Sequence, residues 1–459
     1  MLNLNLDYKD YKLLTERERM NLSEKIFEAG VVGAGGAGFP THVKSQSQVE
    51  YMIANGAECE PLLHKDFELM VNFPEQVVKG LQLMKNAVGA KKAVIGIKSK
   101  NAAAIEAISE AIQEQNAEIE IAELEDYYPA GDEYELVYNV TGRLIPPHGI
   151  PLDVGAVVNN VESLYNVALA AEGEAVTEKF IVVTGAVKNP SAFWVPVGTR
   201  FSELLEFAGG ATVGDFAFFD GGLMMGKLSD DLSKPVTKTS GAVVVLPREH
   251  HLVARLSKSF AEMNRIGKSA CDQCSYCTEF CPRYLLGYEV QPHKVMRTLG
   301  FTHSGDAVWN EYADLCSMCG LCTLYACPEE LYPREANIQA KKVLSEQGKR
   351  HEQKREVKVH PMKKGRKTPT KRLIKKLDVA KYDVASPFRE GFPEPREVKI
   401  LTKQHVGAPA IPTVTLGAKV NRGDVIARPK EGALGSVIHA SINGAVTHVS
   451  DEFIRIAKE

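Results

Sequence analysis

Eight of the nine cysteines stand in two short runs whose spacing predicts iron–sulfur chemistry. The runs are Cys271, Cys274, Cys277 and Cys281 before Pro282, and Cys316, Cys319, Cys322 and Cys327 before Pro328. Each matches the run of bacterial two-cluster ferredoxins, in which the fourth cysteine ligates the other cluster. We therefore expect two [4Fe-4S] clusters, with Cys327 completing the first set and Cys281 the second. The second run has one extra residue before Cys327.

Structural zinc is the alternative interpretation, because zinc commonly takes four ligands from two separated C-x-x-C pairs. Three cysteines within seven residues, found twice and each time followed by a Cys-Pro, favour iron–sulfur over zinc. The N-terminus lacks the basic and apolar regions of a secretory signal. Clustered cysteines in such a chain indicate a reducing compartment, so we expect a cytoplasmic location.

A glycine-dense loop at 31–44, VVGAGGAGFPTHVK, is the second candidate site. Gly33 to Gly38 match G-x-G-x-x-G, but the loop follows a predicted helix, and Pro40 comes directly after Phe39. A dinucleotide fingerprint should instead follow a strand and open a helix. The residues alone leave three interpretations open: a Rossmann fingerprint, a structural glycine turn, or another nucleotide-phosphate loop whose backbone N–H groups bind an anion.

A polar turn, Asn55-Gly56-Ala57-Glu58-Cys59-Glu60-Pro61, follows the predicted strand 51–55. Asn and Glu side chains crowded into such a turn can hydrogen-bond ribityl or ribose hydroxyls. A solvated polar turn is the plainer alternative. Cys59 is the ninth cysteine, and we interpret it as a small core residue without a metal.

Length and composition place these candidates in a globular protein of several domains. The 459 residues predict roughly three domains. Hydrophobic residues at 44% and charged residues at 25% suit ordered cores. The net charge of −3 gives no basic field for nucleic acid. No apolar run is long enough for a transmembrane helix, so none is expected.

The elements that must position these residues divide the chain into six predicted segments. They are a flexible leader (1–20), an α/β domain with a mainly parallel sheet (21–175), a small α+β module (176–250), a helical domain with the cysteines (251–345), a basic linker (346–395) and a compact all-β module (396–459). In the leader, Leu13, Leu14, Arg17 and Met20 match helical spacing only faintly, so a targeting helix stays an open alternative.

The basic segment 349–376 has thirteen Lys and Arg residues against two acids. It lacks interleaved aromatic side chains, so we do not expect it to bind nucleic acid. A solvated linker, or a strap over the acidic remainder of the chain, is the favoured interpretation, with a docking site for an acidic partner as the alternative.

Four segments occur in the order GAGGAGFPTHVK, NGAECEP, YYPAGDE (127–133) and VVNNVES (157–163). Together they resemble the flavin- and NADH-binding subunit of respiratory complex I and, more closely, the RnfC component of the Rnf electron-transport complex. The resemblance implies a Rossmann-like FMN/NADH domain, a β-grasp (SLBB) module, a helical ferredoxin-like domain with two [4Fe-4S] clusters, and a barrel-sandwich hybrid domain. RnfC proteins have the last domain at the N-terminus, whereas here it is C-terminal. That order is similar to the cobalamin reductase family of propanediol-utilisation microcompartments.

Carried over residue by residue, the resemblance implies two sets of contacts. FMN would be lined by Gly33, Gly35, Lys44, Asn55, Glu58, Tyr128, Gly131, Asp132, Asn159 and Asn160. NADH would face Gly36, Phe39, Glu60 and Glu133. Three positions depart from complex I, because Ala34 replaces an arginine, Ala57 an aspartate and Asp132 a glutamate. These departures leave the preference for NADH over NADPH open.

The resemblance implies an NADH-dependent flavoprotein iron–sulfur reductase that passes electrons through FMN and two [4Fe-4S] clusters to a corrinoid. Its partners would be NADH and a corrinoid or an electron-accepting protein, with microcompartment enzymes or shell proteins nearby. One alternative is a reductase that recycles NAD or feeds another acceptor, such as a glycyl-radical system. A second is an electron-relay subunit of a membrane complex. No cobalt ligation is assigned to His405 or His439.

Overall fold

The computed structural model describes residues 16–299 and 310–458, so most of the predicted leader lies outside the described residues. Helix α1 (Glu16–Glu28) begins inside the segment 1–20 that the sequence predicted as a flexible leader. It ends near Gly30, whose positive φ of 73° reverses the chain into the glycine loop. A short helix, α2 (Thr41–Ser45), follows that loop.

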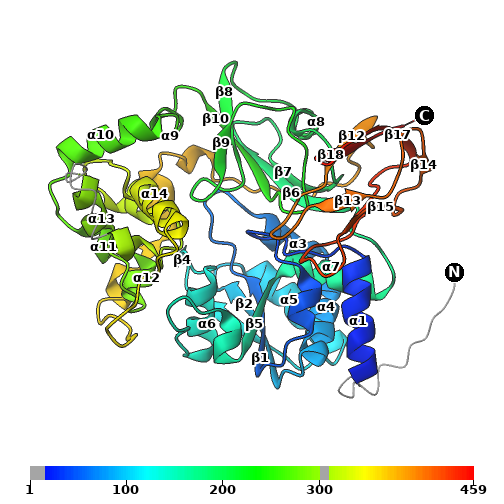
Figure 1. The fold of residues 1–459 in the computed structure, drawn as a ribbon, viewed down its shortest axis with the longest axis horizontal. Coiled ribbons are helices and arrows are strands. Elements are labelled where there is room, and N and C mark those ends of the chain that lie inside the picture. Colours follow the sequence, from blue (N-terminus) through cyan, green and yellow to red (C-terminus); the bar gives the residue numbers. More distant parts are fainter. Residues whose placement is uncertain (1–15, 300–309, 459) are drawn as a thin grey trace.

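The N-terminal domain is built on a four-stranded parallel sheet (Figure 1). Its strands in spatial order are β3 (Ile119–Leu124), β2 (Lys92–Lys98), β1 (Tyr51–Gly56) and β5 (Ala156–Asn160). One face packs on α3 (Lys65–Asn72), α4 (Pro74–Ala87), α5 (Ala102–Glu114) and α7 (Val161–Ala171). The other face packs on α6 (Glu133–Thr141) through Leu136 and Val137. Burial on both faces explains why β1, β2 and β5 are largely apolar runs, whereas the edge strand β3 alternates between apolar residues and glutamate.

The next module is a five-stranded mixed sheet covered by one helix. The strand order is β7 (Ser191–Pro196), β6 (Glu178–Gly185), β10 (Ala242–Pro247), β8 (Phe216–Asp220) and β9 (Lys227–Ser229). Helix α8 (Phe201–Phe207) buries Phe201 and Leu204 against one face. The other face contributes Phe180 and Phe219 to the core of the N-terminal domain, so the two modules share one hydrophobic cluster.

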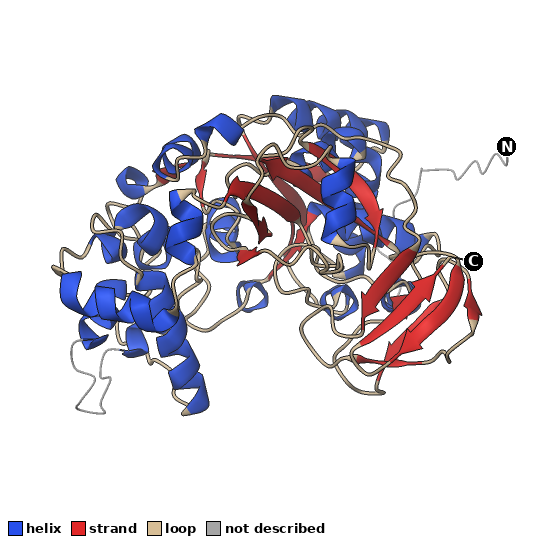
Figure 2. Ribbon diagram, turned by 90° about the horizontal axis from the view of Figure 1, so that it is seen from above, coloured by secondary structure: helices blue, strands red, loops and turns tan. Residues whose placement is uncertain are grey.

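The cysteine-bearing domain is made of short helices. They are α9 (His251–Leu256), α10 (Phe260–Ala270), α11 (Tyr276–Glu279), α12 (Pro282–Leu285), α13 (Pro292–Thr298) and α14 (Pro333–Glu346). A π-helical turn, Cys322–Ala326, lies within the second cysteine run. Figure 2 shows this helical domain at one end of the molecule and the C-terminal sheets at the other.

The basic segment forms a strap, one of the two forms predicted for it. Strand β11 (Thr368–Pro369) pairs with β4 (Tyr127–Tyr128), and α15 (Thr370–Lys376) buries Leu373 and Ile374. Lys363 lies 2.6 Å from the buried Glu135 carboxylate. Further ion pairs join the strap to Glu125, Glu279 and Glu330. The strap therefore ties the flavin domain to the cysteine domain.

The C-terminal domain consists of two sheets packed face to face. One contains β12 (Glu397–Leu401), β18 (Phe453–Ala457), β17 (Gly444–Val449) and β14 (Lys419–Val420), and the other β13 (Ala410–Pro412), β15 (Val425–Pro429) and β16 (Ile438–His439). Ile400, Ile426 and Ile456 are buried between them. Across residues 16–299 and 310–458, no helix combines the length and apolar character needed to cross a membrane.

Candidate functional site

The predicted flavin residues converge at the carboxyl edge of the parallel sheet. Asn55 ends β1, Asn159 and Asn160 end β5, and the turn 127–133 follows β3. The Asn55 side chain donates to the carbonyl of Gly131 at 3.0 Å, which joins the first turn to the third. Ligands of open α/β sheets bind at this edge, so three of the four segments singled out in the sequence meet where a nucleotide can bind.

The glycine loop reaches the same edge from outside the sheet. It is closed by a hydrogen bond from the Gly33 N–H to the Phe39 carbonyl at 2.9 Å and by a bridge between Val32 and Pro40. Its Ala34 N–H donates to the Ser163 hydroxyl at 2.8 Å. Because the loop lies between α1 and α2 rather than after a strand, it is not an ordinary Rossmann fingerprint.

The loop has the features of an anion-binding nest. Gly36 has φ +82°, and a Cβ at this position would meet no atom within 4 Å, so its outer face is open. Within the described chain, the N–H groups of Gly35, Gly36 and Ala37 have no protein acceptor. Free backbone N–H groups in a left-handed turn bind phosphate well. Phe39 is 36% exposed at the end of the loop, where an aromatic face can meet a ring.

Two further features fit FMN. The side-chain oxygen of Asn159 is buried without a partner in the described structure, an arrangement that a bound hydrogen-bond donor would relieve. Lys44 donates to the Val158 carbonyl at 2.7 Å. Burial lowers the pKa of Lys44 while the Glu133 carboxylate works in the opposite direction. Burial also raises the pKa of Glu133, and Lys44 partly offsets this rise.

Glu58 and Glu60, two of the predicted nucleotide contacts, form hydrogen bonds with the protein backbone. The carboxylate of Glu58 accepts the backbone N–H groups of Asp66 and Phe67 at 2.8 and 3.0 Å, at the start of α3. The carboxylate of Glu60 accepts those of Met224 and Met225. Burial is the main cause that raises both pKa values to about 7. These acids therefore fix the polar turn against its neighbours.

The turn 127–133 lies directly against the second cysteine loop. The Tyr128 hydroxyl donates to the Cys319 carbonyl at 2.7 Å, and both side chains are buried. Asp132 caps α6 and pairs with Arg283 at 3.0 Å. The guanidinium of Arg283 also lies 3.4 Å from the ring centre of Tyr134. Because Arg283 is two residues after Cys281, this contact joins the flavin turn to a predicted cluster ligand.

The structure gathers the eight cysteines into two sets, each around its own small cavity. One cavity is lined by Cys271, Cys274, Cys277 and Cys327, and the other by Cys281, Cys316, Cys319 and Cys322. Each set therefore takes three cysteines from one run and the fourth from the other run. The ligation itself stays a prediction.

The two cysteine loops have the same backbone geometry. Gln273 and Ser275 have positive φ in the first loop, and Met318 and Gly320 have positive φ at the equivalent positions of the second. The first loop continues into the α-helical turn α11, whereas the second continues into the π-helical turn Cys322–Ala326. A π-helical turn accommodates one more residue than an α-helical turn. It therefore absorbs the extra residue that precedes Cys327.

The burial and close packing of the cysteine thiols are suited to binding an iron–sulfur cluster. Burial is the main cause that raises the pKa of Cys281 to about 12, with a further contribution from Cys316. It also raises the pKa values of Cys277, Cys319 and Cys322. Thiolates packed this closely would require a cation, which the iron of a bound cluster would supply. Backbone N–H groups already point at sulfur, as from Met318 to Cys316 at 3.3 Å and from Leu331 to Cys327 at 3.3 Å.

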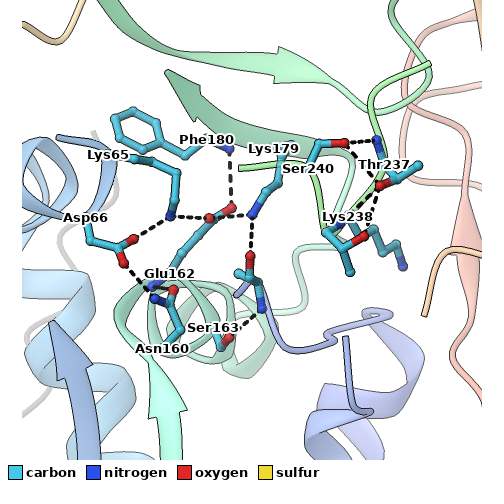
Figure 3. Close-up of polar contacts among 12 residues, drawn as sticks. Lys65, Asp66, Asn160, Glu162, Ser163, Lys179, Phe180, Thr237, Lys238 and Ser240 are labelled. Atoms are coloured by element: carbon cyan, nitrogen blue, oxygen red, sulfur yellow. Dashed lines mark hydrogen bonds and ion pairs between the residues drawn. The ribbon is translucent and has the colours of Figure 1, made fainter. Parts of the chain in front are cut away.

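Sequence reasoning missed a buried charge network beneath the glycine loop (Figure 3). Glu162 is fully buried and accepts from Lys65 at 2.9 Å and from Lys179 at 2.5 Å. Asp66 pairs with Lys65 and accepts from Asn160 at 2.7 Å. Glu162 lies two residues after Asn160 in the segment VVNNVES, but no local sequence pattern reveals its two lysine partners.

Four family models match the chain. They are the Nuo51 FMN-binding domain at 26–169, the SLBB domain at 180–228, the 4Fe-4S dicluster domain at 270–332 and the RnfC Barrel sandwich hybrid domain at 386–459. These matches confirm the predicted fold class, FMN and the two [4Fe-4S] clusters as cofactors. The fold and site define an electron-transferring flavoprotein with an iron–sulfur domain.

Sequence similarity to known proteins identifies the family within this class. The chain is 40% identical to "Cobalamin reductase PduS" of Salmonella typhimurium, over 95% of this chain and 96% of that protein. It is 39% identical to the protein of the same name from Citrobacter freundii, over 96% and 97%. It is 33% identical to a component of the proton-translocating ferredoxin:NAD(+) oxidoreductase complex of Clostridium ljungdahlii, over 60% of this chain and 58% of that protein. The chain belongs to the PduS cobalamin reductase family.

Double substitutions test which cysteines belong to the same set. Anaerobically purified protein should contain about eight iron atoms per chain. Because Cys281 and Cys316 lie in one set, the double variant Cys281→Ala/Cys316→Ala should retain about four. Cys274→Ala/Cys281→Ala removes one cysteine from each set and should retain almost none. Iron and sulfide analysis gives the readout, and Cys59→Ala, outside both sets, should keep the full content. If each run held its own cluster, the two double variants would exchange results.

The nucleotide contacts can be tested by two alanine substitutions. Asn159→Ala should raise the dissociation constant of FMN about tenfold, the size expected for one lost hydrogen bond in a buried site. Glu133→Ala should leave FMN binding close to wild type and weaken NADH binding. Flavin fluorescence measures the first, and the NADH concentration dependence of flavin bleaching measures the second. If the two variants change both cofactors equally, or neither, the residue assignments are wrong.

Proposed function

We propose that the chain reduces a corrinoid with electrons taken from NADH. Identity of 40% to a cobalamin reductase along 95% of the chain is the observation that supports this most strongly. The order of domains agrees, because the barrel-sandwich hybrid match lies at the C-terminal end, 386–459.

The chain's own residues would perform distinct tasks. The nest of Gly35, Gly36 and Ala37 binds the FMN phosphate, so Gly36, which the resemblance assigned to NADH, is proposed as a flavin contact instead. Lys44 adds positive charge to the flavin site. Asn159 hydrogen-bonds the flavin from the end of β5. Phe39 and Glu133 face NADH. Bound FMN supplies the exchange between a two-electron donor and one-electron acceptors, and [4Fe-4S] clusters supply one-electron transfer.

The position of the turn 127–133 supports a direct link between the two cofactor regions. Tyr128 contacts the second cysteine loop, and Asp132 holds Arg283 beside Cys281. The cysteine set completed by Cys281 therefore lies closer to the flavin edge. The set containing Cys274 lies beyond it and is more accessible, because Cys274 is exposed. The acceptor then meets the domain on the side of Cys274.

The finer assignments form part of the same proposal. Each cysteine set ligates one [4Fe-4S] cluster, and the domain limits are those predicted from the sequence, except that α1 begins the first domain at Glu16. The partners are NADH and a corrinoid, together with other enzymes of a microcompartment. An acceptor other than a corrinoid is the second candidate, since relatives of the Rnf type match over 60% of the chain.

A cysteine substitution separates flavin reduction from acceptor reduction. Cys274→Ala should abolish corrinoid reduction, because it removes a ligand from the exposed set. NADH-dependent flavin bleaching should stay within about twofold of wild type, because the flavin site belongs to another domain. Stopped-flow absorbance measures the flavin, and corrin absorbance under anaerobic conditions measures the acceptor. Ser269→Ala, an exposed side chain just before the first run, serves as the control.

Two outcomes would contradict this account. If Cys274→Ala reduces the corrinoid as fast as wild type, electrons leave without the exposed cysteine set. If the wild-type protein bleaches flavin but never reduces a corrinoid, the acceptor is a different one.

A further inference from the structure

The glycine loop is held from three modules. The Val406 N–H of the C-terminal domain donates to the Ala37 carbonyl at 3.0 Å, and another support comes from the β-grasp module. Lys179, on β6, donates to the Ala34 carbonyl at 3.2 Å (Figure 3). Ser163, on α7, accepts from the N–H of the same residue at 2.8 Å. Ala34 is only 2% exposed. The peptide groups on both sides of Ala34 are therefore fixed just before the open N–H groups of the nest.

Lys179 reaches this position because of Glu162. The carboxylate of Glu162 is fully buried and accepts from Lys179, from Lys65 and from the backbone N–H of Phe180 at 3.3 Å. A buried carboxylate is costly unless it is paired and fully hydrogen-bonded. The two ammonium groups satisfy this requirement, and the fixed carboxylate in turn determines where Lys179 points.

The same network extends to the asparagine pair of the flavin site. Asp66 binds Lys65 on one side and the Asn160 amide on the other, at 2.7 Å. The Asn160 oxygen caps α7 by accepting from the Glu162 N–H at 3.0 Å. Burial lowers the pKa of Lys179 to about 8, whereas Asp66 and Glu162 overcome the effect of burial on Lys65 and raise its pKa. Lys179 therefore loses its proton more readily than Lys65.

We propose that Lys179 is a positioning residue of the flavin site, and that the β-grasp module completes this site by holding the glycine loop in its anion-binding shape. This inference rests on the proposed FMN site but not on the proposed acceptor. Losing the ammonium would release the Ala34 carbonyl and leave Glu162 with one cation. The nest would then bind phosphate less tightly even though Lys179 lies behind the loop.

The alternative is that Lys179 only stabilises the contact between modules. Lys238 offers a matched comparison, because it is a second buried lysine of the same module. It donates to the carbonyls of Gly30 and Val437 at 2.7 and 2.8 Å and contacts neither Ala34 nor Glu162. A lysine with a purely structural role should behave as Lys238 does.

The test compares the FMN affinity of the wild type and of four variants. Each protein keeps its iron, is freed of flavin and is then titrated with FMN in the absence of NADH and corrinoid. Lys179→Met should raise the FMN dissociation constant at least tenfold and change the visible circular dichroism of the flavin that still binds at saturation. Lys179→Arg should recover most of the affinity, since it keeps the charge. Lys238→Met should bind FMN within about twofold of wild type, whatever its effect on melting temperature. Ser163→Ala, which frees the Ala34 N–H with little change in volume, should weaken FMN about threefold.

Far-ultraviolet circular dichroism shows whether each variant is folded, and iron content shows whether the cysteine domain, which is separate from β6, is intact. The proposal is overturned if Lys179→Met binds FMN as wild type does. It is also overturned if Lys179→Met and Lys238→Met weaken FMN equally, because Lys179 would then act only through stability. Should Lys179→Met fail to fold, Ser163→Ala decides, and unchanged FMN affinity in that variant overturns the proposal. If the wild-type protein does not reduce a corrinoid but the variants show the expected FMN affinities, only the proposed acceptor is contradicted.

Discussion

The turn 127–133 must serve two cofactor regions at once, and much of the architecture depends on this constraint. Its backbone accepts from Asn55 at the flavin edge, while Tyr128 and Asp132 contact the second cysteine loop and Arg283. The strap reinforces the turn, because β11 pairs with β4 and Lys363 binds Glu135. Electron transfer between a flavin and a cluster requires short distances. A turn fixed on both sides keeps the two regions together.

Buried charge gives the flavin edge its rigidity. Lys65, Asp66, Glu162 and Lys179 come from three elements and neutralise one another in buried positions. Removing one member of such a network leaves an uncompensated charge, which costs more than an exposed ion pair. The glycine loop has little regular structure of its own, so this network and Ser163 contribute to its shape, together with the hydrogen bonds from Gly33 to Phe39 and from Val406 to Ala37.

Much of the fold and of the cysteine chemistry could be predicted from the sequence, because both depend on local patterns. Cysteine spacing and strand–helix alternation are visible within short windows, and the family models confirm the domains they indicated. Contacts between residues far apart in the chain could not be predicted from the sequence. Glu58 and Glu60 are predicted nucleotide contacts, and the sequence did not reveal that their carboxylates also accept backbone N–H groups of α3 and of the 224–225 loop. Lys179 and Glu162 meet only through tertiary packing.

The central claim is that one chain joins a flavin edge to a cysteine set within electron-transfer reach. The most direct measurement is electron paramagnetic resonance of anaerobic holoprotein after addition of NADH alone. The account predicts reduced [4Fe-4S] signals that reach most of the intensity obtained with dithionite. Clusters that dithionite reduces but NADH leaves oxidised, in protein whose flavin NADH bleaches fully, would contradict it.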